Sequence, residues 1–264
     1  MKNTMKEFNS VPVVVLCGGR SVTMGEGPGV PSNKALVQVR HQPLFWWVLR
    51  HYVRYGATQF LMATGYQSER FADALIALGA KASVQDPQSF DINIAQTACH
   101  IRLIPTAPQA TTASRLLACK PWLADAERFA LTYSDTLSDA DLGAEMRFHQ
   151  AQKLAATLVS TRPPVRFRIL GIRQGESLVR AFAPRPVIES TCINGGYYIF
   201  SPAIWDSIYG VTQNVALENQ PLERLAAASQ LAAFEHKGAW HYCDGERDLA
   251  TLQDIAETLD TPSA

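Results

Sequence analysis

The feature that most constrains the fold is an uninterrupted apolar run at residues 11–17, which reads VPVVVLC and ends at Gly18 and Gly19. A short run that is apolar at every position is typical of a strand buried on both faces, and such strands belong to parallel sheets covered by helices. The carboxyl end of a parallel strand opens into the crevice where α/β proteins bind their ligands. The two glycines therefore stand where a ligand is expected.

The rest of the chain alternates between helix and strand patterns. Helices are predicted at residues 43–55, 68–78, 113–123, 140–153, 221–228 and 249–259, and further strands at residues 60–64, 101–104, 128–133, 155–161 and 196–200. This alternation predicts an α/β fold with a mostly parallel central sheet. No repeat or linker interrupts it, so we expect one domain over residues 1–264, with a flexible N-terminus over residues 1–10.

The charge balance is neutral, because 24 Lys and Arg residues offset 24 Asp and Glu residues. Proteins that coat DNA or RNA neutralise phosphates with an excess of Lys and Arg, so this balance argues against nucleic acid as a partner. A small anionic substrate needs only a local cluster of positive charge. The composition therefore directs attention to small anions rather than to polymeric ones.

The cysteines and the N-terminus bear on location. The chain has five cysteines, an odd number, and none lies within four residues of another, which is typical of reduced thiols rather than of a disulfide framework or a metal knuckle. Residues 1–12 lack the apolar core of a signal peptide. No stretch reaches the ~18 apolar residues of a membrane span. We therefore expect a cytoplasmic protein with no membrane partner.

The loop after the first strand is rich in glycine. Residues 16–25 read LCGGRSVTMG, and Lys34 follows the loop. Two glycines let a backbone approach a ligand and turn its N–H groups toward phosphate oxygens, and Lys34 adds a point charge. An ordinary strand-to-helix turn with a surface lysine explains the same residues. The loop contains neither GxxxxGK[ST] nor GxGxxG, so it is neither a P-loop nor a dinucleotide fingerprint.

An acidic residue, Asp135, lies just past the strand predicted at residues 128–133, in the sequence LTYSD. Its position at the carboxyl edge of the sheet suits a divalent cation, because Mg²⁺ takes one or two carboxylates together with substrate phosphates. The alternative is a turn or helix-capping aspartate without a ligand.

The C-terminal half contains four more distinctive segments. Residues 194–200 read NGGYYIF, residues 218–225 read ENQPLERL, residues 231–240 read LAAFEHKGAW and residues 244–248 read DGERD. Together with the opening glycine pair, they resemble the sugar-1-phosphate nucleotidyltransferases, and within that superfamily the glucose-1-phosphate cytidylyltransferases. The resemblance covers nearly the whole chain and is poorest at residues 80–101.

This resemblance implies a Rossmann-like αβα sandwich in which the phosphate of a sugar 1-phosphate attacks CTP with Mg²⁺, forming a CDP-sugar and pyrophosphate. Homo-oligomers are common in the superfamily. The residues that would bind the nucleotide are Leu16, Gly18, Gly19 and Lys34. Those that would bind the sugar phosphate are Arg185, Asn194, Gly195 and Glu218. Asp135 and Asp244 would share the metal, and the catalytic cations would be Lys34, Arg20 and Arg185.

The glycine-rich loop departs from the family pattern. Where the family reads GGxGTRL, this chain reads GGRSVTM at residues 18–24, so Thr23 replaces the arginine that would meet the triphosphate. Thr carries neither the charge nor the fork of Arg, although Arg20 lies three residues away. Two interpretations follow, an active nucleotidyltransferase and an impaired paralogue that binds nucleotide or sugar phosphate as a regulatory or partner subunit. Retention of Asp135 and Asp244 favours the enzyme.

Overall fold

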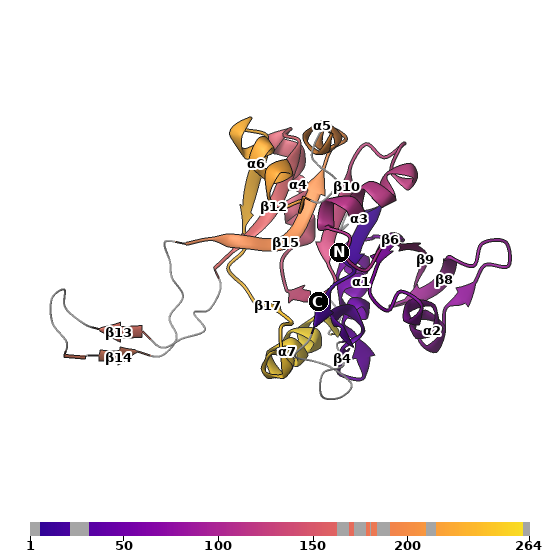
Figure 1. The fold of residues 1–264 in the computed structure, drawn as a ribbon, viewed down its shortest axis with the longest axis horizontal. Helices are drawn as coiled ribbons and strands as arrows, with labels where there is room; N and C mark the ends of the chain where they lie inside the picture. The colour runs from indigo at the N-terminus through magenta and orange to yellow at the C-terminus, as the bar shows by residue number, and fades with distance from the viewer. Residues whose placement is uncertain are drawn as a thin grey trace, which may run out of the picture.

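A central sheet crosses the molecule in the computed structural model, which describes residues 6–21, 32–162, 169–171, 178–179, 181–183, 191–209 and 215–260. Within these ranges the sheet has nine strands (Figure 1). From one edge to the other they are β16 (Leu231–Glu235), β12 (Ala156–Thr161), β15 (Ile193–Phe200), β10 (Phe129–Tyr133), β1 (Val13–Cys17), β6 (Gln59–Thr64), β9 (Thr97–Pro105), β8 (Ser89–Ile94) and β7 (Lys81–Ala82).

The central strands β10, β1, β6 and β9 run parallel, and β15 and β8 flank them in the antiparallel direction. Leu16 of β1 stands level with Tyr133 of β10 and Ala63 of β6. The carboxyl ends of these three strands therefore meet at one edge of the sheet. All five residues of β1 are buried, as its apolar sequence predicts.

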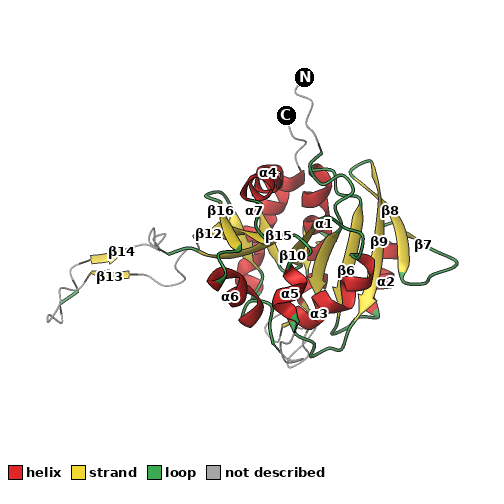
Figure 2. Ribbon diagram, turned by 90° about the horizontal axis from the view of Figure 1, so that it is seen from above, coloured by secondary structure: helices red, strands yellow, loops and turns green. Residues whose placement is uncertain are grey.

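Helices cover both faces of the sheet (Figure 2). One face packs against α1 (Leu44–Arg54), α2 (Arg70–Ala77), α4 (Leu142–Gln152) and α7 (Leu249–Asp260). The other packs against α3 (Thr112–Cys119), α5 (Ile204–Ile208) and α6 (Gln220–Ala227). The hydrophobic core is accordingly split into two clusters, one on each face. The predicted αβα sandwich with a mostly parallel central sheet is confirmed.

The first helix shows why the sequence folds in this way. Leu44, Val48 and Tyr52 recur at intervals of four residues, and all three are almost fully buried. Burying one such side chain contributes roughly 1.5–3 kcal/mol relative to leaving it exposed. The helix ends just before Gly56, whose φ of +96° suits a residue without a Cβ.

Among the described residues, four two-stranded ladders and several short turns lie outside the nine-stranded sheet. They are β2 (Arg20–Ser21) with β3 (Ser32–Asn33), β4 (Gln38–Val39) with β5 (Gln42–Pro43), β11 (Thr136–Ser138) with β17 (Trp240–Tyr242), and β13 (Ile169–Gly171) with β14 (Ala181–Ala183). Three 3₁₀ turns among the described residues are η1 (Lys34–Leu36), η2 (Lys120–Trp122) and η3 (Glu246–Asp248). The β13–β14 ladder lies apart from the sheet in Figure 1.

Two segments differ from the sequence prediction. The strand expected at residues 101–104 is the longer β9, paired with β8 in a hairpin whose turn residues Ala95 and Gln96 both have positive φ. Such turns usually carry Asn or Gly, so the usual sequence signal is absent. Residues 6–10 belong to the terminus that is expected to be flexible, and one of them, Phe8, is anchored to the core. Phe8 is fully buried against Tyr52, and its N–H donates to the Tyr55 carbonyl.

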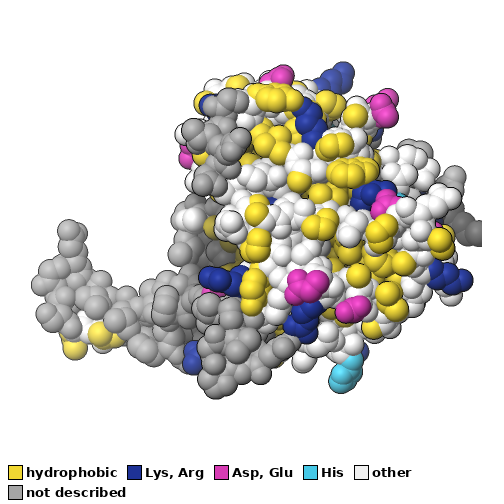
Figure 3. All heavy atoms as spheres, turned by 45° about the vertical axis from the view of Figure 1, so that its right-hand side comes forward, with side chains coloured by type: hydrophobic (Ala, Val, Ile, Leu, Met, Phe, Trp, Pro, Cys, Tyr) yellow, Lys and Arg dark blue, Asp and Glu magenta, His cyan; other side chains and the backbone are white. Residues whose placement is uncertain are grey.

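The surface carries both signs of charge. On the face drawn in Figure 3, Lys and Arg side chains lie among acidic and hydrophobic ones rather than in one basic patch. None of the helices in the described ranges is long and apolar enough to cross a membrane.

Candidate functional site

The glycine turn and Lys34 are held together at the carboxyl end of β1. The Lys34 N–H donates to the Gly19 carbonyl at 3.1 Å. Asn33, which is fully buried, donates through Nδ2 to the carbonyls of Cys17 at 2.9 Å and Tyr66 at 2.6 Å. Its Oδ1 accepts the N–H of Ala35, the second residue of η1, at 2.9 Å. The chain is therefore anchored one residue before Lys34, so the lysine side chain starts from a fixed point.

Two acidic side chains converge on this lysine. Lys34 Nζ lies 3.5 Å from Asp135 Oδ2 and 3.5 Å from Asp244 Oδ1. Asp135 follows β10, and Asp244 follows β17. The β11–β17 ladder brings these segments together, and the Cys243 N–H donates to the Asp135 carbonyl at 2.7 Å. The structure thus assembles the two predicted metal ligands around one predicted phosphate-binding residue.

The environment of Asp135 opposes its ionisation. Burial raises the pKa of its carboxyl, and the Lys34 ammonium counteracts part of this effect. Its side chain is nonetheless 27% exposed, so it can contact a ligand from the cavity side. A carboxylate in this position gains strongly from any cation placed beside it.

A hydrogen-bond network holds the turn that presents Asp244. Asp248 Oδ2 accepts the N–H groups of Asp244 at 2.8 Å and Gly245 at 2.9 Å. Its Oδ1 lies 2.9 Å from His241 Nε2. Burial raises the pKa of Asp248, but these hydrogen bonds outweigh it and leave the pKa below its ordinary value. Asp248 stays ionised and fixes the backbone of the Asp244 turn.

A cavity of about 320 Å³ opens beside these residues, at the carboxyl edge of the sheet. Six of the predicted site residues line it, namely Leu16, Gly18, Gly19, Arg20, Lys34 and Asp135. The other lining residues come from the loop after β9, from α3 and from the end of β10, and include Thr112, Arg115 and Tyr133. No sequence motif marks these last three residues.

Arg115 adds a positive charge to the cavity wall. It is 4% exposed, and among the described residues its guanidinium donates to neutral oxygens, including the carbonyls of Thr64 at 2.8 Å and Pro108 at 3.1 Å. A Cβ added at Gly18 or Gly65 would overlap the guanidinium, so both glycines permit its approach. Burial lowers the pKa of Arg115, but an arginine keeps its charge in proteins. The sequence signal that could have identified Arg115 is the presence of an arginine on the buried face of the helix predicted at residues 113–123.

The predicted sugar residues belong to a second network behind Tyr133. Asn194 donates to the Tyr198 hydroxyl, which lies 3.0 Å from the Tyr133 hydroxyl, and Tyr133 donates to Glu218 Oε1. Thr112 donates to the other oxygen of Glu218 at 2.6 Å. Because Thr112 and Tyr133 also line the cavity, this network connects the predicted sugar side with the nucleotide side.

The remaining predicted residues lie differently. Gly195 is buried against β12, where an added Cβ would lie 2.8 Å from the Val159 carbonyl oxygen, so it serves close packing. Arg20 is exposed, and its guanidinium carbon lies 5.9 Å from the centre of the Tyr66 ring, in cation–π geometry. Arg185 and Thr23 lie outside the described residues.

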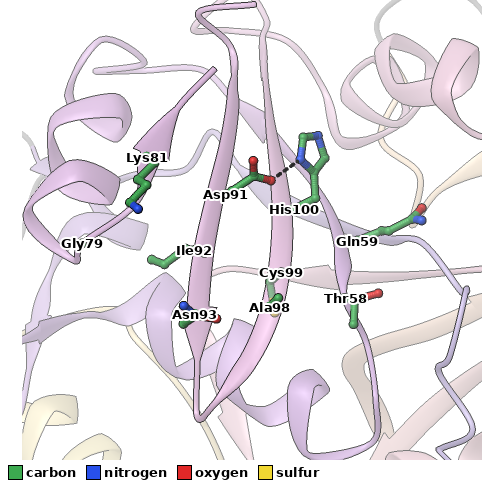
Figure 4. A pocket seen from close by; sticks show the side chains of 10 residues that line it. All are labelled: Thr58, Gln59, Gly79, Lys81, Asp91, Ile92, Asn93, Ala98, Cys99 and His100. Carbon is green, nitrogen blue, oxygen red and sulfur yellow. Dashed lines mark hydrogen bonds and ion pairs between the residues drawn. The ribbon is translucent and has the colours of Figure 1, made fainter. Parts of the chain in front are cut away.

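A larger cavity of about 460 Å³ lies elsewhere, along β6, β8 and β9 (Figure 4). It includes Thr58 and Gln59 at the start of β6, so it lies at the opposite end of that strand from the glycine turn. Asp91 and His100 form a hydrogen bond of 2.9 Å there, and Lys81 lies on the edge strand. Cavity volume therefore does not identify the candidate site. The convergence of Asp135 and Asp244 on Lys34 identifies it.

Curated relatives cover nearly the whole chain. It is 30% identical over 254 residues to the glucose-1-phosphate cytidylyltransferase of Salmonella typhimurium. The aligned region covers 94% of this chain and 97% of that protein. It is 27% identical over 241 residues to a probable glucose-1-phosphate cytidylyltransferase of Bacillus subtilis, covering 89% of this chain and 92% of that protein. No model of a protein family matches the sequence.

Solved structures share the fold. A putative glucose-1-phosphate thymidylyltransferase of Bacillus anthracis superposes with a TM-score of 0.68 at 16% identity, covering 96% of this chain and 97% of that one. The inositol-1-phosphate CTP transferase of T. maritima superposes with a TM-score of 0.64 at 11% identity, and the superposition covers both chains fully. The relatives and the site motifs agree, and the chain belongs to the family of glucose-1-phosphate cytidylyltransferases among the sugar-phosphate nucleotidyltransferases.

Proposed function

We propose that this chain joins a sugar 1-phosphate, of the glucose 1-phosphate type, to CTP, forming a CDP-sugar and pyrophosphate. The observation that carries the proposal is the convergence of Asp135 and Asp244 on Lys34 beside the glycine turn, where Lys34 and Asp135 line a cavity at the carboxyl edge of parallel strands. The names of the relatives support CTP and glucose 1-phosphate as the substrates.

The reaction needs positioning and charge rather than a protein nucleophile. A phosphate oxygen of the sugar 1-phosphate attacks the α-phosphorus of CTP, and the bond from that phosphorus to the β-phosphate oxygen breaks. Pyrophosphate carries away the electron pair. Gly18 and Gly19 would place the triphosphate, and Lys34 and Arg115 would stabilise its negative charge. Such electrostatic stabilisation in phosphoryl transfer is worth several kcal/mol.

Asp135 and Asp244 are suited to Mg²⁺. Their carboxylate oxygens already converge on a single cation, the Lys34 ammonium, and oxygen is the donor that Mg²⁺ prefers. The bound ion would neutralise charge that develops on the phosphates. On the sugar side, Glu218 would accept hydrogen bonds from hydroxyl groups, and Asn194 would accept or donate them, with Arg185 as the proposed partner of the sugar phosphate.

The altered loop supports the alternative of an impaired paralogue that binds its ligands without turnover. Arg20, the nearest substitute for the missing loop arginine, lies over Tyr66. Arg115 argues for the enzyme, because it contributes a buried positive charge against Gly18 whatever residue stands at position 23. We therefore favour turnover.

The experiment is pyrophosphate release from CTP, Mg²⁺ and glucose 1-phosphate, with other nucleoside triphosphates and sugar 1-phosphates as comparators. We expect release that requires all three components. Asp135→Ala should abolish it with little change in melting temperature, whereas Asp91→Ala, at an exposed carboxylate of the other cavity, should leave it intact. No release with any pair, while CTP still raises the melting temperature, would establish the paralogue instead.

We also propose that the protein is cytoplasmic and forms a homo-oligomer. Burial raises the pKa of Cys99 to about 11 and that of Cys119 to about 12, so both remain unreactive thiols, as suits a reducing cytoplasm. A homo-oligomer remains a prediction from the superfamily. Fractionation of cells and light scattering on the purified chain test these two points.

A further inference from the structure

Lys34 occupies the point between the two proposed metal ligands. Its ammonium is equidistant from Asp135 and Asp244, at 3.5 Å from each, and only 18% of its side chain is exposed. A divalent ion held by both carboxylates would lie within a few ångströms of this ammonium. Like charges that close repel strongly, so the two cations compete for one place.

The donor set is also too small to hold the metal by itself. The described part of the chain contains no group of three or more His, Cys, Asp or Glu side chains placed to hold a metal ion. Two carboxylates suit Mg²⁺ only when substrate phosphates and water complete its octahedral shell. The metal therefore depends on the phosphates for further ligands.

The same phosphates offer the lysine a new partner. Its backbone is fixed by Asn33 and Gly19, but the four-carbon stem is flexible. The stem passes over the glycine turn, since an added Cβ at Gly19 would lie 3.8 Å from Lys34 Cδ. A phosphate held by the turn lies within reach of the ammonium through a side-chain rotation alone.

We infer that Lys34 is a resident cation that stands in for the metal in the nucleotide-free protein and yields its place when nucleotide and metal enter together. This inference rests on the proposed function. It means that binding of the divalent ion and binding of the nucleotide are coupled through one lysine side chain. The ammonium prevents the site from capturing metal alone and then moves to the phosphates.

The test is binding of Mn²⁺, followed by electron paramagnetic resonance, to the purified chain without nucleotide. We expect the wild type to bind Mn²⁺ weakly and Lys34→Gln to bind it at least tenfold more tightly, because the competing charge is gone. Lys34→Arg, which keeps the charge, should stay weak. Adding Asp135→Asn to Lys34→Gln should remove the gain and so assign it to this site. Circular dichroism and melting temperature verify that each variant is folded.

Measurements with CTP distinguish a failure of the inference about Lys34 from a failure of the proposed function. With CTP, the wild type should bind Mn²⁺ tightly. Lys34→Gln should also gain affinity from the phosphate ligands, but by a smaller factor than the wild type, because its nucleotide-free site has no ammonium to displace. If the wild type gains affinity with CTP but Lys34→Gln binds free Mn²⁺ no more tightly than the wild type, the inference about Lys34 is wrong and the proposed function stands. If CTP binds neither alone nor with Mn²⁺, the proposed function fails and the inference fails with it.

Discussion

The hydroxyl of Tyr133 donates a hydrogen bond to Oε1 of Glu218, joining the end of β10 to the segment that precedes α6. Thr112 donates to the second carboxylate oxygen. Because Asn194 donates to Tyr198 and Tyr198 in turn lies against Tyr133, all the donors of this network point toward Glu218. Burial raises the pKa of Tyr133, so its phenol remains a donor. The carboxylate is therefore fixed before any ligand binds.

Removing the Tyr133 hydroxyl should loosen this carboxylate. A hydrogen bond to a charged group is worth roughly 1.5–3 kcal/mol, so we expect Tyr133→Phe to raise the KM for the sugar 1-phosphate about tenfold or more while that for CTP changes little. Steady-state kinetics with each substrate varied in turn checks this. Tyr209→Phe, at an exposed tyrosine, is the matched control. Equal increases in both KM values would contradict a role on the sugar side.

Replacement of Arg115 should act on the nucleotide side. Arg115→Gln removes a buried positive charge from the wall beside Gly18, so CTP should lose affinity by roughly 10-fold or more, as expected for one charge-assisted contact. The measurement is the CTP-induced rise in melting temperature relative to each variant's own baseline. Arg102→Gln, which loses an ion pair with Asp86 at the surface, is the control. A full CTP response in Arg115→Gln would show that this arginine only supports the loops.

The sequence predicts the parts of this fold that depend on apolar periodicity. The buried run at β1 and the helical period of α1 both correspond to the structure. It does not predict the β8–β9 turn, because positive φ at Ala95 and Gln96 is imposed by the hairpin rather than by residue type.

Within the candidate site, the strand ends locate Gly18 and Asp135, because a strand end is visible in a sequence. Arg115 and Tyr133 are not visible in this way. Each reads as part of an ordinary helix or strand, and only the tertiary packing brings them to the cavity. Contacts between segments far apart in the chain, such as Lys34 with Asp244, come from the resemblance to relatives and not from local pattern.

Glu145 should make the stability of the protein depend on pH. It is 1% exposed, and its Oε1 has no hydrogen-bond partner among the described residues. Burial raises the pKa of its carboxyl to about 8, so the folded protein keeps a proton that the unfolded chain releases near pH 4.5. The unfolded state then binds fewer protons between these values, and stability falls as pH rises through this window, by roughly 1.4 kcal/mol per pH unit.

Glu145→Gln should remove this dependence. The variant should match the wild type near pH 4.5, where both side chains are neutral, and exceed it by a few kcal/mol near pH 8. Urea unfolding at a series of pH values measures the difference. Glu127→Gln, at an exposed glutamate, keeps Glu145 and should therefore retain the wild-type slope. Parallel stability curves for Glu145→Gln and the wild type would mean that the carboxyl is not held neutral by the fold.

Gly196 combines two constraints that a matched pair of variants can separate. Its φ is +80°, and an added Cβ would lie 2.6 Å from Tyr133 Cδ2. Gly79 has a similar φ of +90° with nothing within 4 Å of its added Cβ. Gly79→Ala should therefore cost only the backbone strain, about 1–2 kcal/mol. Gly196→Ala should cost clearly more in urea unfolding and should also raise the KM for the sugar 1-phosphate, because it displaces Tyr133 from Glu218. If both variants lose the same stability, the contact between Gly196 and the tyrosine ring has no energetic weight and the strand alone positions Tyr133.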